Sequence, residues 1–79
     1  MSSDKPKALV TGASSGIGAA TAVELARRGM AVAVHYFSNA DGGRQTVQAI
    51  RDTGGEAFAI KADMRQQGEV QRMVAEVLK

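Results

Sequence analysis

The chain has 79 residues, of which 44% are hydrophobic and 23% are charged, and it contains no cysteine. This length allows one small domain, and the composition is typical of a folded globular protein. The absence of cysteine excludes disulfides and thiolate metal sites, and the single histidine, His35, cannot hold a metal ion by itself. We therefore expect no metal site.

Charge and hydropathy argue against two classes of partner. Ten Lys and Arg against eight Asp and Glu give a net charge of +2, the basic residues form no cluster, and aromatic residues are scarce. We therefore expect no nucleic-acid surface. Residues 1–7 lack the apolar core of a secretory signal, and the longest apolar run, residues 30–34, is too short to span a membrane. We expect a cytoplasmic protein with no membrane partner.

In chain order, residues 1–6 are predicted to form a flexible leader that ends at a proline, and an apolar strand follows over residues 7–11. The strand leads directly into TGASSGIG at residues 11–18, which opens a helix predicted over residues 15–28. The first amides of a helix lack internal partners and carry the positive end of the helix dipole. This turn is therefore suited to bind a phosphate.

Each glycine of the turn has a separate predicted role. We expect Gly12 to make the tight turn after the strand and Gly16 to let a pyrophosphate approach the backbone. Gly18 should let the helix pack closely against the strand. The spacing differs from the commoner G-x-G-x-x-G fingerprint, and the Lys and Ser/Thr of a Walker phosphate loop are missing.

The rest of the chain repeats the alternation of strand and helix. The continuous apolar run at residues 30–36 is typical of a parallel strand covered on both faces, and Asp41 is the expected N-cap of a helix that ends near Thr53. A third strand is predicted over residues 56–62. The third helix has apolar residues at helical spacing, which we expect to be core: Val70, Met73, Val74, Val77 and Leu78.

The order β-α-β-α-β-α with short connections predicts right-handed crossovers and a parallel sheet. The expected fold is a three-layer α/β structure of the Rossmann type with strand order 3-2-1, in which the first two helices cover one face and the third covers the other. The first strand is then an edge of the sheet, although its sequence is apolar. An uncovered apolar edge would be a site of association.

The residues after the second strand bear on the choice of cofactor. An Asp or Glu about twenty residues after the glycines would bind the ribose hydroxyls of NAD. Tyr36 occupies that place, and residues 30–40 contain no acid. Ser15, Ser38 and Asn39 can donate hydrogen bonds to a 2′-phosphate, so the sequence favours NADP(H) over NAD(H). Arg44 could add positive charge, but we interpret it as a surface residue, and His35 as a satisfied residue at the strand end.

The string TGASSGIG closely resembles the cofactor turn of the short-chain dehydrogenase/reductase family, T-G-x-x-x-G-[IL]-G. The resemblance extends over residues 7–79 and is to the N-terminal third of members such as ketoacyl reductases and glucose dehydrogenases. It implies hydride transfer between nicotinamide and a carbonyl or alcohol. It also implies a set of cofactor-binding residues: Gly12, Ser14, Ser15, Gly16, Ile17, Gly18, Tyr36, Phe37, Ser38, Asp63 and Met64.

Within this set, the resemblance places Asp63 and the Met64 amide at the adenine, and we favour this role for Asp63 over the alternative, the N-cap of the third helix. Arg65 stands where the family often has Ser or Thr. The family's catalytic Ser, Asn and Tyr-x-x-x-Lys lie beyond the third helix, and Tyr36, the only tyrosine, has Ala40 at the lysine place. We therefore assign no catalytic residue and expect a truncated half of a domain, whose complete form would be a homo-oligomer such as a tetramer.

Two alternatives remain open from the sequence. The chain could be a stand-alone nucleotide-binding module without catalysis, or a non-catalytic fragment that associates through the open edge of its first strand. A receiver-like phosphorelay domain is disfavoured, because such domains need acids at the end of the first strand, where Leu9 and Val10 stand. The substrate, the reaction direction and its stereochemistry do not follow from the sequence.

Overall fold

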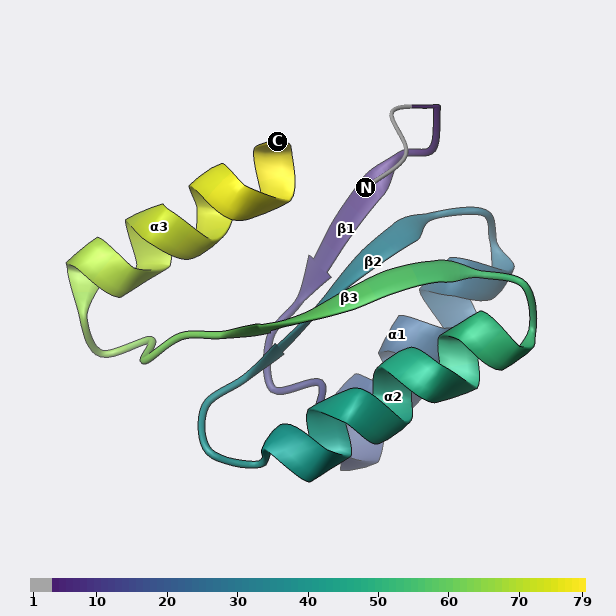
Figure 1. The fold of residues 1–79 in the computed structure, drawn as a ribbon, viewed down its shortest axis with the longest axis horizontal. Coiled ribbons are helices and arrows are strands. Elements are labelled where there is room, and N and C mark those ends of the chain that lie inside the picture. The colour runs from purple at the N-terminus through teal and green to yellow at the C-terminus, as the bar shows by residue number, and fades with distance from the viewer. Residues whose placement is uncertain (1–3) are drawn as a thin grey trace.

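Three strands alternate with three helices along the chain in a computed structural model that describes residues 4–79 (Figure 1). Their bounds fall within one or two residues of the predicted ones. The predicted leader at residues 1–6 lies partly outside the described residues. The elements are β1 (Lys7–Val10), α1 (Gly16–Arg27), β2 (Ala31–Tyr36), α2 (Ala40–Asp52), β3 (Glu56–Lys61) and α3 (Gln67–Leu78).

The strands form one parallel sheet in the order β1-β2-β3, which confirms the predicted Rossmann-type α/β topology. Val10 pairs with Val34 at the end of β1, and Tyr36 pairs with Lys61 at the end of β2. The first five residues of β2 are buried, as expected for a central strand covered on both faces. Within residues 4–79, β1 pairs with β2 alone and is therefore an edge strand.

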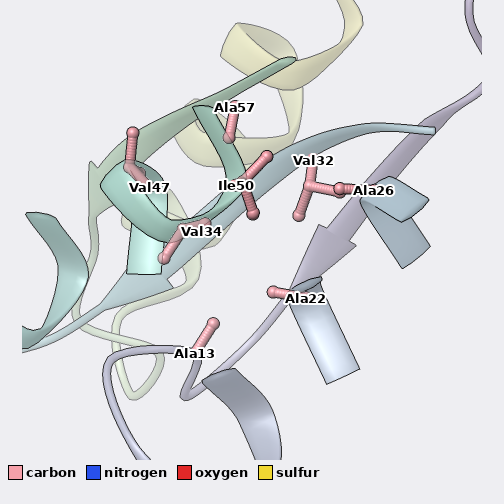
Figure 2. Close-up of a cluster of buried hydrophobic side chains, with 8 residues drawn as sticks. All are labelled: Ala13, Ala22, Ala26, Val32, Val34, Val47, Ile50 and Ala57. Atoms are coloured by element: carbon pink, nitrogen blue, oxygen red, sulfur yellow. The ribbon is translucent and has the colours of Figure 1, made fainter. Parts of the chain in front are cut away.

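The helices lie on the two faces of this sheet as predicted, with α1 and α2 on one side and α3 on the other (Figure 1). On the first face, Ile50 of α2 packs with Val32 and Val34 of β2 (Figure 2). Ala22 and Ala26 of α1 join the same cluster, and their small side chains let α1 lie close to the sheet. This cluster joins α1 and α2 to one face of the sheet.

The apolar stripe of α3 is only partly buried. Met73 and Val77 pack against the second face of the sheet, but Val74 is 40% exposed and Leu78 is 71% exposed. The prediction that the whole stripe is core is therefore wrong for Val74 and Leu78. Each directly follows a buried residue, so it lies about 100° further round the helix. That rotation carries both side chains past the contact with the sheet.

Asn39, rather than the predicted Asp41, is the N-cap of α2. The Asn39 Oδ1 accepts a hydrogen bond from the Gly42 amide at 3.0 Å. Asp41 already lies within the helix and pairs with Arg44. The reason is that the first helical turn begins at Ala40, so the capping oxygen must come from the residue before it.

Among the described residues, no helix has the length and apolar character that crossing a membrane requires.

Candidate cofactor site

The turn between β1 and α1 has the backbone geometry that its glycines predict. Gly12 and Gly16 both have φ of 62°, in the left-handed region that favours glycine. A Cβ on Gly16 would meet no atom within 4 Å, so the backbone there borders open space. Ser15 is the N-cap of α1 but makes no side-chain capping bond, and the first turn of α1 carries no acidic residue. The first amides of α1 thus remain available to an anion.

Gly18 brings α1 into backbone contact with the turn. A Cβ at this position would overlap the carbonyl oxygen of Gly12 and lie 2.9 Å from its carbonyl carbon. It would also lie 3.1 Å from Cα of Ala13. The helix can approach the end of β1 this closely only without a side chain at Gly18, which confirms the predicted close packing.

The segments that follow the three strands meet at one edge of the sheet. The Ala13 amide, after β1, donates to the carbonyl of His35 in β2 at 2.9 Å, and the Ala62 amide, after β3, donates to the carbonyl of Tyr36 at 3.1 Å. The His35 ring is 4% exposed and both its nitrogens have partners, in agreement with its interpretation as a satisfied strand-end residue. The glycine turn, Tyr36 and the start of the Asp63 segment therefore share this edge.

Asp63 lies next to this edge and pairs with Arg65. The Arg65 guanidinium donates to both carboxylate oxygens at 3.0 Å, and the Arg65 amide donates to Oδ1, also at 3.0 Å. The side-chain hydrogen bonds from Arg65 lower the pKa of Asp63, so this carboxylate is ionised at neutral pH. The guanidinium carbon of Arg65 also lies 5.3 Å from the ring centroid of Phe37. This pair brings the loops after β2 and β3 together.

The interpretation of Asp63 as the N-cap of α3 is wrong. The cap is Gln66, which makes no side-chain capping bond, and α3 begins at Gln67. Arg65 is the physical reason, because its amide and guanidinium hold the Asp63 carboxylate in a local turn ahead of the helix. The next residue, Met64, has a side chain that is 44% exposed.

A groove runs between the N-terminal parts of α1 and α2. It is lined by Ser14 and Ser15 on one side and by Gly42 and Thr46 on the other. Gly42 is required for this approach, because a Cβ there would overlap the carbonyl oxygen of Ser14. The groove opens beside the glycine turn, so the two serines lie where α1 and α2 converge.

The polar residues after β2 differ in what they can still donate. Ser38 is exposed, whereas Asn39 uses its Oδ1 in the cap of α2, which leaves only its side-chain NH₂ for another partner. The Arg44 side chain is 70% exposed and pairs with Asp41, in agreement with its interpretation as a surface residue. Arg65, which the sequence marked only as a departure, is the cation that contacts Phe37.

The support that Thr46 and His35 give to the turn was not recognised from the sequence. The Thr46 hydroxyl, buried in α2, donates to the carbonyl of Ala13 at 2.8 Å. Nδ1 of His35 accepts a hydrogen bond from the Gly12 amide at 3.1 Å. Thr46 and His35 are both polar residues among apolar neighbours, which is the one signal in the sequence that could have identified these roles.

Comparison with known proteins agrees with this geometry. The family model described as short chain dehydrogenase matches residues 6–79. The short-chain dehydrogenase/reductase homolog YusS of Bacillus subtilis is 45% identical over 71 residues, which cover 90% of this chain and 65% of YusS. A hydroxynaphthalene reductase-like protein, Arp2 of Metarhizium guizhouense, is 49% identical over 71 residues, 90% of this chain and 27% of Arp2.

A solved structure is similar to the same elements. The landomycin C-6 ketoreductase LanV, determined with bound NADP and rabelomycin, has a TM-score of 0.79 and 45% sequence identity. The match covers 84% of this chain and 27% of LanV. The chain thus spans less than two thirds of YusS and about a quarter of the reductases it matches.

Proposed function

This chain belongs to the short-chain dehydrogenase family, and from that membership we propose that it forms the NADP(H)-binding portion of a reductase that transfers hydride between nicotinamide and a carbonyl or alcohol. Residues 7–79 would form the N-terminal half of the dinucleotide-binding domain. One observation carries the proposal. The uncapped first turn of α1, opened by two glycines at positive φ, lies at the sheet edge shared by Tyr36 and the Asp63 segment.

The proposed cofactor would lie across this edge. Its pyrophosphate would bind the first amides of α1, with Ser14 and Ser15 at the groove beside them. Ile17 is 87% exposed on the first turn of α1 and offers the cofactor an apolar surface. When bound, the nicotinamide ring accepts or donates the hydride.

The other half of the cofactor would lie over the loops after β2 and β3. Tyr36, Phe37 and Ser38 would contact the adenosine and its 2′-phosphate, and no carboxylate in this loop opposes that phosphate. The ionised Asp63 would accept a hydrogen bond from the adenine amino group, and the Met64 amide would donate to the ring. Arg65 screens the charge of Asp63 and contacts Phe37, so it supports this pocket.

We assign none of the described residues a role in substrate binding, in acid–base catalysis or in contacts between subunits. LanV was solved with bound NADP and rabelomycin, and its bound NADP supports the proposed preference for NADP(H). By the same family membership, the complete enzyme would be a homo-oligomer, with a tetramer the expected form.

A charge placed after β2 tests the cofactor preference. Phe37 is 47% exposed, so an Asp or an Asn at this position should leave the fold intact. We expect Phe37→Asp to weaken NADPH binding by about tenfold relative to Phe37→Asn, because the new carboxylate repels the 2′-phosphate. NADH binding should differ between the two variants by less than about threefold, since NADH lacks that phosphate. Fluorescence titration of both nucleotides measures the difference.

The Asn variant is the matched control, because it has nearly the same size and hydrogen-bonding capacity as Asp without the charge. An equal loss of NADPH affinity in both variants would mean that Phe37 acts through its ring, at the adenine. Wild-type protein that binds NADH as tightly as NADPH would overturn the preference for NADP(H).

A further inference from the structure

His35 makes an unusual set of contacts for a residue in a buried strand. It lies in β2, the central strand, at the end that faces the proposed cofactor. Its Nδ1 accepts a hydrogen bond from the Gly12 amide at 3.1 Å, and its Nε2 lies 2.9 Å from the carbonyl oxygen of Ala62. One ring therefore connects the turn after β1 with the segment after β3.

The sheet topology explains why a side chain is needed for this connection. Backbone hydrogen bonds in a sheet join only neighbouring strands, and β2 separates β1 from β3. The glycine turn and the segment that leads to Asp63 therefore cannot bind each other through a strand ladder. A side chain from the end of β2 with two opposed polar atoms can bind both.

The partners of the ring fix its protonation. The Gly12 amide can only donate, so Nδ1 must be unprotonated, and the Ala62 carbonyl can only accept, so Nε2 must carry the hydrogen. The neutral Nε2–H tautomer satisfies both partners, whereas the imidazolium and the Nδ1–H tautomer do not. The bond to Ala62 thus sets the tautomer that presents an acceptor to Gly12.

We propose that His35 is a positioning residue for cofactor binding: its neutral ring, oriented by Ala62, holds the Gly12 amide and so keeps the glycine turn in the conformation that receives the pyrophosphate. This inference rests on the proposed function, because it assigns a role at the same site. His35 is 4% exposed and acts through the turn rather than by touching the cofactor.

Two substitutions test separately the two hydrogen bonds that the His35 ring makes. In asparagine, the side-chain oxygen is at the same covalent distance from Cβ as Nδ1 of histidine, so His35→Asn keeps an acceptor for Gly12 and loses the bond to Ala62. In glutamine, the side-chain nitrogen is at the distance of Nε2, so His35→Gln keeps the donor to Ala62 and leaves the Gly12 amide without its acceptor. Both variants retain polar groups for a buried position.

We expect His35→Gln to weaken NADPH binding by about tenfold or more, and His35→Asn by less than about threefold, because only the asparagine still holds the turn. Hydrogen exchange of the Gly12 amide, measured by NMR without cofactor, should be slow in wild type and His35→Asn and faster in His35→Gln. Val77→Ala is the stability control, since Val77 packs in the second core cluster, away from the turn. It should lower stability and leave NADPH affinity unchanged.

The outcomes distinguish the positioning role of His35 from the proposed binding of NADPH. If the wild type binds NADPH and the Asn and Gln variants bind it equally well or equally weakly, the positioning role is wrong and the proposed function stands. If loss of affinity in the three variants simply follows their loss of stability, His35 is structural only. Failure of the wild type to bind NADPH, with Gly12 exchange as expected, overturns the proposed function and the positioning role with it.

Discussion

Alanine at Gly18 is expected to lower NADPH affinity by at least about tenfold and to destabilise the fold by roughly 1–3 kcal/mol. The added Cβ would overlap the Gly12 carbonyl oxygen and lie 2.9 Å from the carbonyl carbon, and both atoms belong to the backbone. Because neither can rotate away, α1 must move off the turn. That movement shifts the first amides of α1 away from the phosphate position.

The matched control is Gly68→Ala. Gly68 lies in the first turn of α3, where a Cβ would meet no atom within 4 Å and no positive φ is required. Alanine there should raise stability by about 0.5–1 kcal/mol through its helix propensity, and cofactor affinity should not change. Urea denaturation and NADPH titration measure both quantities. If Gly18→Ala behaves like Gly68→Ala, the contact between α1 and the turn is not required.

Truncation of Ile50 should have the largest effect on stability. Ile50 is fully buried in α2 and packs with Val32 and Val34 in the cluster that joins two helices to the sheet (Figure 2). Ile50→Ala is expected to cost about 2–5 kcal/mol, because it removes apolar contacts and leaves a cavity. In a domain of this size that is much of the total free energy of unfolding.

Two other substitutions calibrate this loss. Ile50→Val should cost about 0.5–1.5 kcal/mol, since it removes a single methylene. Leu78→Ala should change stability by less than about 0.5 kcal/mol, because Leu78 is 71% exposed. Circular dichroism during urea unfolding gives all three values. A cost for Ile50→Ala no greater than that for Leu78→Ala would contradict the assignment of this cluster as the core.

The topology could be predicted from the sequence because it depends on patterns local to each element. The apolar run of β2 predicted a strand covered on both faces, as a central strand is. Gly12 and Gly18 predicted the turn and the contact of α1, because each is required by backbone geometry rather than by a distant partner. The family resemblance then indicated which residues along the chain would bind the cofactor.

The supporting contacts could not be predicted, because they join residues far apart in sequence. The Thr46 hydroxyl, in α2, donates a hydrogen bond to the Ala13 carbonyl in the turn before α1. The His35 ring makes hydrogen bonds to the segments that follow the two strands beside its own. Asp63 was assigned two possible roles, and the choice between them depended on Arg65, whose guanidinium turns back onto the carboxylate. Competition between neighbouring polar groups at a helix start is decided by geometry that composition does not carry.

The shift of the cap from Asp41 to Asn39 has the same origin. Both side chains favour N-cap positions, and the chain uses the earlier one because α2 starts at Ala40. A helix boundary displaced by one or two residues changes which side chain serves as the cap. It also changes which polar groups remain free for a ligand, as the partly used Asn39 shows.

The most direct test of the central claim is a titration of isotope-labelled protein with NADPH, followed by NMR at each backbone amide. The account predicts saturable shifts at the amides of residues 12–18 and at Met64, with smaller changes along the outer face of α3. It also predicts weaker binding of NADH. The absence of saturable shifts, or shifts confined to β1 that follow protein concentration rather than nucleotide, would contradict cofactor binding and favour association through the edge of the sheet.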